Sequence, residues 1–145
     1  MAIPSGSGTE VLKRVYLDNA STTEQSIFDG VANHIYTVLS VIMKGQAVNS
    51  SAANRTAHLY LRGYDRVAGA YSSLMFCQWE VQAGETYVWN DKFSFMGYIP
   101  DANTQIAVPL QAGATSQKLS IETDHADTKV DVVCTYIDQD WSGSN

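Results

Sequence analysis

The stretch that decides the fold is residues 71–95, which read YSSLMFCQWEVQAGETYVWNDKFSF. Two apolar, aromatic-rich runs, residues 71–80 and 85–95, flank a short Val-Gln-Ala-Gly segment. Paired runs of β-branched and aromatic residues around a glycine-containing turn are typical of a β-hairpin. The stretch therefore predicts a β protein that is organised around an aromatic hairpin.

Strand-like segments recur along the whole chain, with turn signals between them. They are residues 10–18, 24–28, 34–43, 55–62, 71–80, 85–95, 104–110, 117–123 and 129–137. Short strands at spacings of roughly 8–12 residues indicate an antiparallel sandwich or barrel. About nine strands fit a jelly-roll-like antiparallel β-sandwich best, and this is the predicted fold class.

Two of these segments carry specific expectations about burial. Residues 34–43 (HIYTVLSVIM) form an almost continuous apolar or β-branched run, which predicts a central strand buried on both faces. A buried helix is the alternative, but the β-branched residues favour a strand. In residues 71–80, strict alternation places Leu74 and Phe76 on the face opposite Cys77 and Trp79.

The composition predicts one folded domain with short extensions. Hydrophobic residues make up 45% of the 145 residues and charged residues 17%, which is ordinary for a globular domain. We assign residues 10–141 to one sandwich domain, residues 1–9 to a Gly/Ser-rich arm, and residues 142–145 to a flexible tail. The arm is either a frayed terminus or a docking segment, and Ile3 and Pro4 would give it apolar contacts.

The charge pattern and hydropathy argue against two classes of partner. The formal net charge is −6, and no Lys/Arg cluster is interleaved with aromatic residues, so nucleic acid is not expected as a partner. No apolar run approaches the roughly 20 residues that span a bilayer, so no membrane association is expected. The first residues do not resemble a signal peptide, which predicts a soluble protein made in the cytoplasm.

The two cysteines, Cys77 and Cys134, both lie in apolar strand-like runs. We expect two buried, reduced thiols, because free cysteine is among the most buried residue types. A disulfide is the alternative, and it requires the two Cα atoms to lie about 6 Å apart.

Residues with catalytic or metal-binding chemistry are scattered. The three histidines fall in different segments, and residues 124–127 (Asp-His-Ala-Asp) are the one tight group of candidate ligands. We interpret this group as a solvated polar turn rather than a weak cation site, because no EF-hand or paired-histidine spacing is present. There is no G-x-S-x-G motif and no phosphate-binding loop, so we predict no catalytic residue, metal or cofactor, and no enzyme activity.

The aromatic residues offer a binding surface as a second option. Three tyrosines fall on expected outward faces or loops and are candidates for stacking against sugars: Tyr60, Tyr64 and Tyr98. Tyrosine and tryptophan are also enriched in cores and subunit interfaces, and we favour that placement for most of the aromatic residues.

Several stretches resemble small β-sandwich virion proteins of tailed bacteriophages, in particular head decoration (cement) proteins. They are residues 3–8 leading into 9–14, residues 32–40 (ANHIYTVLS), residues 83–86 before 90–92, and residues 130–140 (VDVVCTYIDQD). The shared features are an A-(G/N)-x-x-Y strand opening and a closing V-D-V strand. The similarity extends over most of the chain but contains no catalytic signature.

The resemblance implies a non-enzymatic protein, often a homotrimer, that binds the major capsid protein on the outside of the assembled capsid and stabilises the shell. It implies contacts to the capsid or to neighbouring subunits through the arm and first strand, at Ile3, Pro4, Ser5, Gly6, Val11 and Leu12. A neck, tail or fibre component of the same particle is a close alternative. A carbohydrate-binding sandwich used in host attachment, and an enzyme with dispersed catalytic residues, are alternatives from other classes.

Overall fold

The computed structural model describes residues 9–31, 34–65, 67, 70–97 and 117–140. This part of the chain contains nine β-strands and one short 3₁₀ helix, with no α-helix among the described residues. In chain order the elements are β1 (Thr9–Ala20), β2 (Gln25–Asp29), β3 (His34–Ala47), η1 (Ala52–Asn54), β4 (Thr56–Asp65), β5 (Ala70–Glu80), β6 (Thr86–Trp89), β7 (Phe93–Met96), β8 (Lys118–Thr123) and β9 (Lys129–Asp140).

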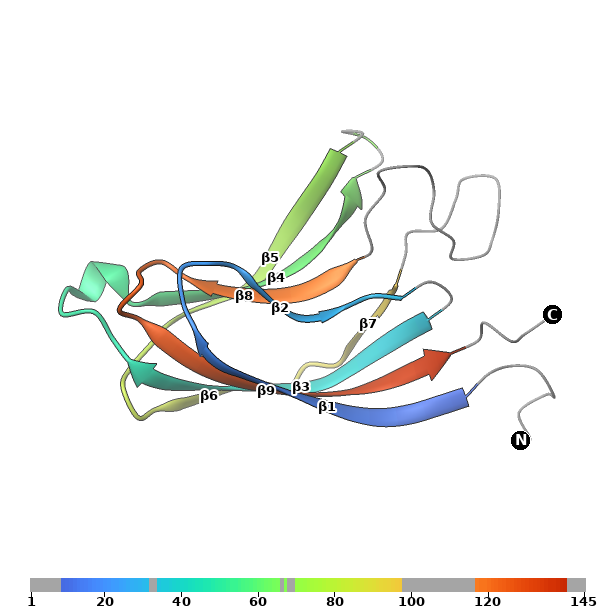
Figure 1. The fold of residues 1–145 in the computed structure, drawn as a ribbon, viewed down its shortest axis with the longest axis horizontal. Coiled ribbons are helices and arrows are strands. Elements are labelled where there is room, and N and C mark those ends of the chain that lie inside the picture. The colour runs from blue at the N-terminus through green and yellow to red at the C-terminus, as the bar shows by residue number, and fades with distance from the viewer. Residues whose placement is uncertain (1–8, 32–33, 66, 68–69, 98–116, 141–145) are drawn as a thin grey trace.

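The strands form two antiparallel sheets that pack face to face (Figure 1). The five-stranded sheet has the order β1-β9-β3-β6, and β7 also pairs with β3. The four-stranded sheet has the order β2-β8-β4-β5. The core lies between the sheets, where the side chains with at most 1% exposure include Met43, Leu59, Leu119, Ile121 and Val132.

The strand pairs are nested in the sequence. β1 pairs with β9, β2 with β8, β3 with β6, and β4 with β5. The chain therefore has the pairing of one long antiparallel hairpin that is folded over on itself. The additional pairs β3–β9 and β4–β8 join the folded parts of this hairpin into two sheets. This is the connectivity of an eight-stranded jelly roll whose sixth strand is divided into β6 and β7. The predicted jelly-roll-like β-sandwich is confirmed.

The predicted aromatic hairpin is wrong, because its two runs lie in different sheets. β5 pairs with β4 in one sheet, whereas β6 and β7 pair with β3 in the other. The segment between them is fixed to both sheets: the N–H of Val81 donates to the carbonyl of Arg55 (2.7 Å), and that of Gly84 donates to the carbonyl of Gly45 (2.8 Å). The glycine turn therefore carries the chain across the sandwich instead of reversing it within a sheet.

The predicted burial of residues 34–43 on both faces is also wrong. On the inner face of β3, Val38, Val41 and Met43 are at most 1% exposed, but Ile42 on the outer face is 39% exposed. β3 is also longer than predicted, since it extends to Ala47. It is central in its sheet, but only one face of that sheet packs against the other layer.

A β-bulge breaks the expected alternation in β5. The register of β4 and β5 shifts between Leu59 and Tyr60, which pair with Cys77 and Met75. Phe76 lies at this shift, and its ring packs against the core. A bulge adds one residue to one strand and redirects its side chains. Phe76 and Cys77 therefore both point inward, contrary to the strict alternation expected from the sequence.

The remaining expectations concern the two cysteines, the strand at 104–110 and the two terminal segments. Cys77 and Cys134 are both buried and unpaired, as predicted. The predicted strand at 104–110, most of the arm and the tail at 142–145 lie outside the described residues. Thr9, the last residue of the predicted arm, begins β1.

Candidate functional site

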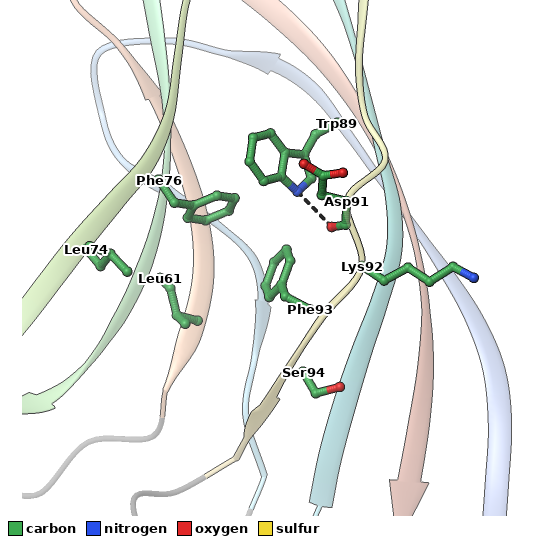
Figure 2. Close-up of a pocket in the computed structure, with 8 residues that line it drawn as sticks. All are labelled: Leu61, Leu74, Phe76, Trp89, Asp91, Lys92, Phe93 and Ser94. Carbon is green, nitrogen blue, oxygen red and sulfur yellow. Dashed lines mark hydrogen bonds between the residues drawn. The ribbon is translucent and has the colours of Figure 1, made fainter.

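An apolar pocket lies where the edge strand β5 faces β6 and β7 across the sandwich (Figure 2). Its volume is about 270 Å³. Both sheets contribute lining residues: Leu61 and Leu74 with Phe76 from one sheet, and Trp89, Asp91, Lys92, Phe93 and Ser94 from the other sheet and the β6–β7 connection.

The aromatic side chains of the pocket hold one another in place. The ring of Phe76 meets those of Trp89 and Phe93 edge-to-face, at centroid distances of 5.3 and 5.1 Å. The indole N–H of Trp89 donates to the carbonyl of Asp91 (3.0 Å), which satisfies its one polar group. Leu74 is 62% exposed, so the pocket opens to solvent on that side.

The lining of the pocket is mostly apolar. Most of its walls are aliphatic and aromatic, with Asp91 beside Trp89 and Ser94 as polar lining residues, and the charged Lys92 side chain extends away from the rings (Figure 2). The volume is below the roughly 300–1,000 Å³ that is typical of small-molecule sites. A pocket of this size and polarity is suited to one or two apolar side chains of a partner.

The outer face of the five-stranded sheet is a second candidate surface. Tyr16 of β1 pairs with Val133 of β9, which pairs with Ile42 of β3, which pairs with Val88 of β6. These residues form one apolar row across β1, β9, β3 and β6, and three of them are well exposed: Tyr16 66%, Ile42 39% and Val88 49%. Leu12, also on this face, is 67% exposed and lies opposite Ile137. We call this row together with Leu12 and Ile137 the apolar sheet face.

The outer face of the four-stranded sheet differs, because its polar groups bond to one another. The hydroxyl of Tyr60 donates to Glu122 (2.9 Å), and burial together with this bond raises the pKa of Tyr60 to about 12. His58 and Arg62 lie two residues before and after Tyr60, with the His58 ring at 6.0 Å and the Arg62 guanidinium at 5.9 Å from the Tyr60 ring. Because these neighbours flank the ring along the strand, Tyr60 does not offer the open aromatic face that sugar stacking requires.

A charged cluster joins three strands of the five-stranded sheet. The carboxylate of Asp138 in β9, which is 5% exposed, accepts a 2.6 Å hydrogen bond from the ammonium of Lys13 in β1. Its other oxygen lies 2.6 Å from Nδ1 of His34 in β3. The hydrogen bond to Asp138 raises the pKa of Lys13. The cluster is a structural tie between β1, β9 and β3, because each charge has a partner within it.

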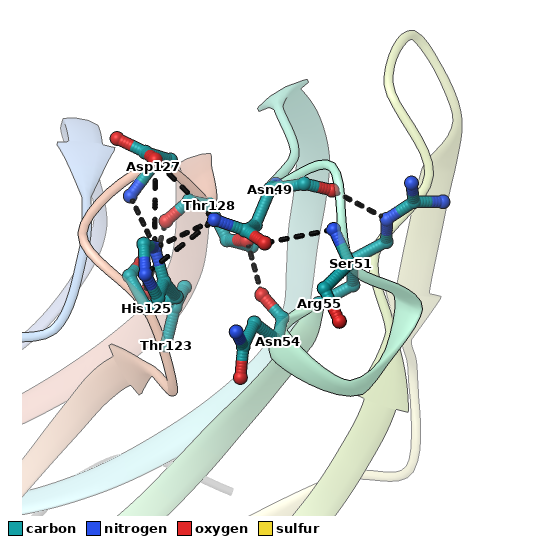
Figure 3. Close-up of polar contacts among 8 residues, drawn as sticks. All are labelled: Asn49, Ser51, Asn54, Arg55, Thr123, His125, Asp127 and Thr128. Atoms are coloured by element: carbon teal, nitrogen blue, oxygen red, sulfur yellow. Dashed lines mark hydrogen bonds and ion pairs between the residues drawn. The ribbon is translucent and has the colours of Figure 1, made fainter.

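The Asp-His-Ala-Asp turn before β9 takes part in a polar network with the loop that follows β3 (Figure 3). Nδ1 of His125 accepts hydrogen bonds from the side-chain amide of Asn49 (3.0 Å) and the N–H of Asp127 (3.1 Å). The buried hydroxyl of Thr128 donates to the carbonyl of Asn54 (2.6 Å). The group interpreted as a solvated polar turn is thus a connection between two loops, and the described residues contain no cluster of three or more potential metal ligands.

The structure brings few of the sequence-predicted contact residues together. Val11 and Leu12 are exposed on β1, at 47% and 67%. Tyr64 falls in β4, but its side chain lies outside the described part of the structure. The other predicted residues are outside the described residues: Ile3, Pro4, Ser5, Gly6 and Tyr98.

The residues of the pocket and of the apolar sheet face were not predicted as sites. The hairpin prediction pairs the run that contains Trp89 and Phe93 with the run that contains Phe76, so local patterns do not indicate that the two runs face each other from different sheets. Tyr16 and Ile42 lie in separate strands, and only the register shows that they belong to one row. The local signal at Tyr16 is an aromatic residue placed between Arg14 and Asp18 at a spacing of two, which indicates an outward position.

Comparisons with known proteins give structural likenesses only. No protein-family model matches the chain, and no curated protein matches it. Among solved structures, one chain from infectious bursal disease virus, Gx strain, is 12% identical with a TM-score of 0.47, covering 96% of this chain and 34% of that chain.

Two further structures come from the xylanase Xyn10B of Clostridium thermocellum. The CBM22-1–GH10 modules complexed with xylohexaose are 15% identical with a TM-score of 0.44, covering 88% of this chain and 24% of that chain. The C-terminal family 22 carbohydrate-binding module is 13% identical with a TM-score of 0.35, covering 97% of this chain and 89% of that chain. This protein thus spans about a third or less of the viral and two-module chains, and likenesses at this level assign no function.

No helix in the described ranges has the length and apolar character needed to cross a membrane.

Proposed function

We propose that this chain is a non-enzymatic virion structural protein of the tailed-bacteriophage type, which binds the assembled capsid and stabilises it. The observation that supports the proposal is the apolar sheet face. Exposed apolar and aromatic side chains that gather in one contiguous row mark interaction surfaces more often than scattered ones do. The proposed partner is the major capsid protein on the outer surface of the shell.

The shape of this face suits contact with an extended protein surface. Residues Tyr16, Ile42 and Val88 lie on a sheet rather than in a cleft, and the row crosses four strands. With strands about 4.8 Å apart, such a row is roughly 14 Å long. A surface of this kind would bury side chains against a capsid without enclosing a substrate. Leu12 extends the contact toward the start of β1 and belongs to the contact set that the family resemblance implies. Val11, which pairs with the buried Asp138, lies on the opposite face of β1 and is not part of this surface.

The test is co-sedimentation of the purified chain with capsids of the same phage that lack it. We expect the unmodified chain to pellet with the capsids, and Tyr16→Ser and Ile42→Thr each to weaken binding by roughly tenfold or more, because each loses buried apolar area. Met75→Ser is the matched control, since Met75 is 45% exposed but lies on the other sheet. Unchanged binding by both sheet-face variants would refute the proposal.

A carbohydrate-binding sandwich is the second candidate, and the open pocket beside Trp89 is the observation that favours it. Sugar rings stack on aromatic side chains, and the pocket places one indole and two phenyl rings together. Titration with glycans should then change the tryptophan fluorescence, and Trp89→Phe should abolish the change. A chain that pellets with capsids and shows no glycan response would favour the structural role over this one.

A further inference from the structure

We propose that the apolar pocket receives Ile3 from the N-terminal arm of a second copy of this chain, with the arm laid along the free edge of β5. The inference deepens the proposed assembly role, and it rests on that role for its biological purpose. It assigns the two surfaces to different partners: the arm binds a neighbouring subunit, and the apolar sheet face, which includes Leu12, binds the capsid.

The first argument is the free edge beside the pocket. Among the described strands, β5 is hydrogen-bonded only to β4, so the other side of this 11-residue strand has no strand partner. A long unpaired edge offers backbone N–H and C=O groups to an added strand. The same strand contributes Leu74 and Phe76 to the pocket, so a segment paired along β5 would have its side chains next to the pocket.

The second argument is the chemistry of the arm. Residues 1–8 read MAIPSGSG and contain no charged side chain. Ile3 is the one β-branched residue among them, and the Gly/Ser residues that follow it form a flexible connection to β1. Pro4 lacks a backbone N–H, which an added edge strand tolerates. An uncharged segment with one isoleucine matches a pocket whose walls are mostly aliphatic and aromatic.

The third argument is the position of the two edges, which favours a second copy over the same molecule. β1 and β6 lie at opposite ends of the strand order β1-β9-β3-β6. The pocket is on the β6 side, where the ring contact between Phe76 and Trp89 joins β5 to β6. The arm therefore leaves the sandwich at the edge farthest from the pocket. Ile3 lies six residues before the start of β1, and six extended residues reach about 20 Å, which is enough to meet an adjacent molecule.

A contact of this kind is heterologous, because the arm side of one copy meets the pocket side of the next. Heterologous contacts form closed rings when the rotation between neighbours closes. The trimer that the family resemblance implies could form in this way. In such a ring, the arm of each of the three copies would occupy the pocket of the next copy.

Disulfide trapping tests the inference directly. Ile3→Cys and Leu74→Cys are made as separate variants, mixed in equal amounts under mild oxidation, and analysed by non-reducing electrophoresis. We expect a disulfide-linked dimer that contains one chain of each variant. The native thiols give little background, since Cys77 is 6% exposed and Cys134 is fully buried. Met75→Cys replaces Leu74→Cys in the matched control, because it is the adjacent exposed residue on the opposite face of β5.

The outcomes separate this inference from the proposed function. A mixed dimer that depends on Leu74→Cys supports docking of the arm in a second copy. If the mixture gives no such dimer, the inference is wrong, and a cross-link within one chain of the double variant would assign the pocket to its own arm. Leu74→Lys should reduce the mass measured by light scattering to that of one chain, whereas Met75→Lys should not. If no cross-link forms but the chain still binds capsids, the inference is refuted and the proposed function stands.

Discussion

The ammonium of Lys13 donates a 2.6 Å hydrogen bond to the carboxylate of Asp138, which is buried at the end of the sandwich where β1 begins. The same carboxylate contacts Nδ1 of His34, so one acidic side chain in β9 is joined to both neighbouring strands. The contact fixes the outer strand that presents Leu12 and Tyr16.

We predict that Lys13→Met lowers the free energy of unfolding by about 1–2 kcal/mol, because Asp138 loses a charge-assisted hydrogen bond that it cannot replace when buried. Urea unfolding followed by circular dichroism measures the change. Arg14→Met is the matched control, since Arg14 is exposed and bonds only weakly to Thr135 (3.3 Å), and its effect should stay within about 0.5 kcal/mol. Equal effects of the two variants would show that the buried carboxylate does not depend on Lys13.

The second prediction concerns alkaline pH. Burial raises the pKa of Tyr36 from 10.0 to about 12, and burial with the Glu122 contact does the same for Tyr60. The pKa of Lys13 is also raised, by its hydrogen bond to Asp138. A group whose folded pKa lies above its unfolded value contributes full stability below the unfolded value, and this contribution is lost as the pH rises through the folded value. Stability should therefore fall between about pH 10 and 12.

Urea midpoints measured across this range test the prediction, with tyrosinate absorbance recorded in parallel. Tyrosine ionisation should accompany unfolding instead of preceding it. Tyr36→Phe should reduce the dependence of stability on pH, because it removes one of the titrating groups. A constant urea midpoint from pH 9 to 12 would contradict the assignment of these groups to the folded core.

The fold class follows from local patterns, whereas the pairing of strands does not. Alternation in residues 117–123 places Leu119 and Ile121 on one face, and both side chains are fully buried in the structure, because a two-residue period is a local property of the sequence. The turn before β6 predicts a hairpin, but β6 pairs in the other sheet. A glycine turn indicates that the chain changes direction, and it does not indicate which sheet contains the next strand. That choice depends on Gly45, which is close in space but far in sequence.

The candidate surfaces were missed for the same reason. Tyr16, Ile42 and Val88 each look like ordinary strand residues, and their common row exists only once the register is known. The bulge at Phe76 has no clear sequence marker, yet it supplies one wall of the pocket. Local periodicity thus predicts elements, and long-range register decides which side chains meet.

Gly45 provides a third prediction, because the chain crosses between sheets against it. A Cβ added at Gly45 would overlap the backbone oxygen of Gln82. Its N–H and carbonyl also bond to Glu85 and Gly84, so the backbone cannot move away freely. We expect Gly45→Ala to lower the free energy of unfolding by about 3 kcal/mol, measured by urea unfolding.

Gly84→Ala is the comparison that separates crowding from backbone strain. Gly84 has φ of +80° but open space around its Cβ position, so alanine there should cost only about 1 kcal/mol. If Gly84→Ala proved as damaging as Gly45→Ala, the close approach of Gly45 to the crossing segment would not be what limits substitution.

The fourth prediction concerns the loop network of Figure 3. The Thr128 hydroxyl donates to the carbonyl of Asn54 (2.6 Å) and accepts from the N–H of Asn49 (3.1 Å), and the residue is fully buried. Thr128→Val keeps the shape but leaves both backbone groups without this partner. We expect a loss of about 1–3 kcal/mol in the free energy of unfolding.

Hydrogen exchange of the Asn49 amide provides a more specific readout, since its protection should fall more than that of amides in β9. Thr86→Val is the matched control, because Thr86 is exposed in a strand, and its effect should remain within about 0.5 kcal/mol. Full protection of Asn49 in the Thr128→Val variant would mean that water replaces the hydroxyl.

The last prediction concerns the two thiols, which lie in opposite sheets and are both shielded. Burial raises the pKa of Cys134 to about 12 and also raises the pKa of Cys77. The thiolate is the reactive form, so both cysteines should resist a thiol-specific reagent in the native protein at pH 8 and react fully in denaturant. Two equivalents of thiol released on unfolding, without reductant, would agree with the unpaired state. Release of none would reveal a disulfide, whereas rapid labelling of Cys77 in the native protein would show that β5 opens at its edge on the time scale of the reaction.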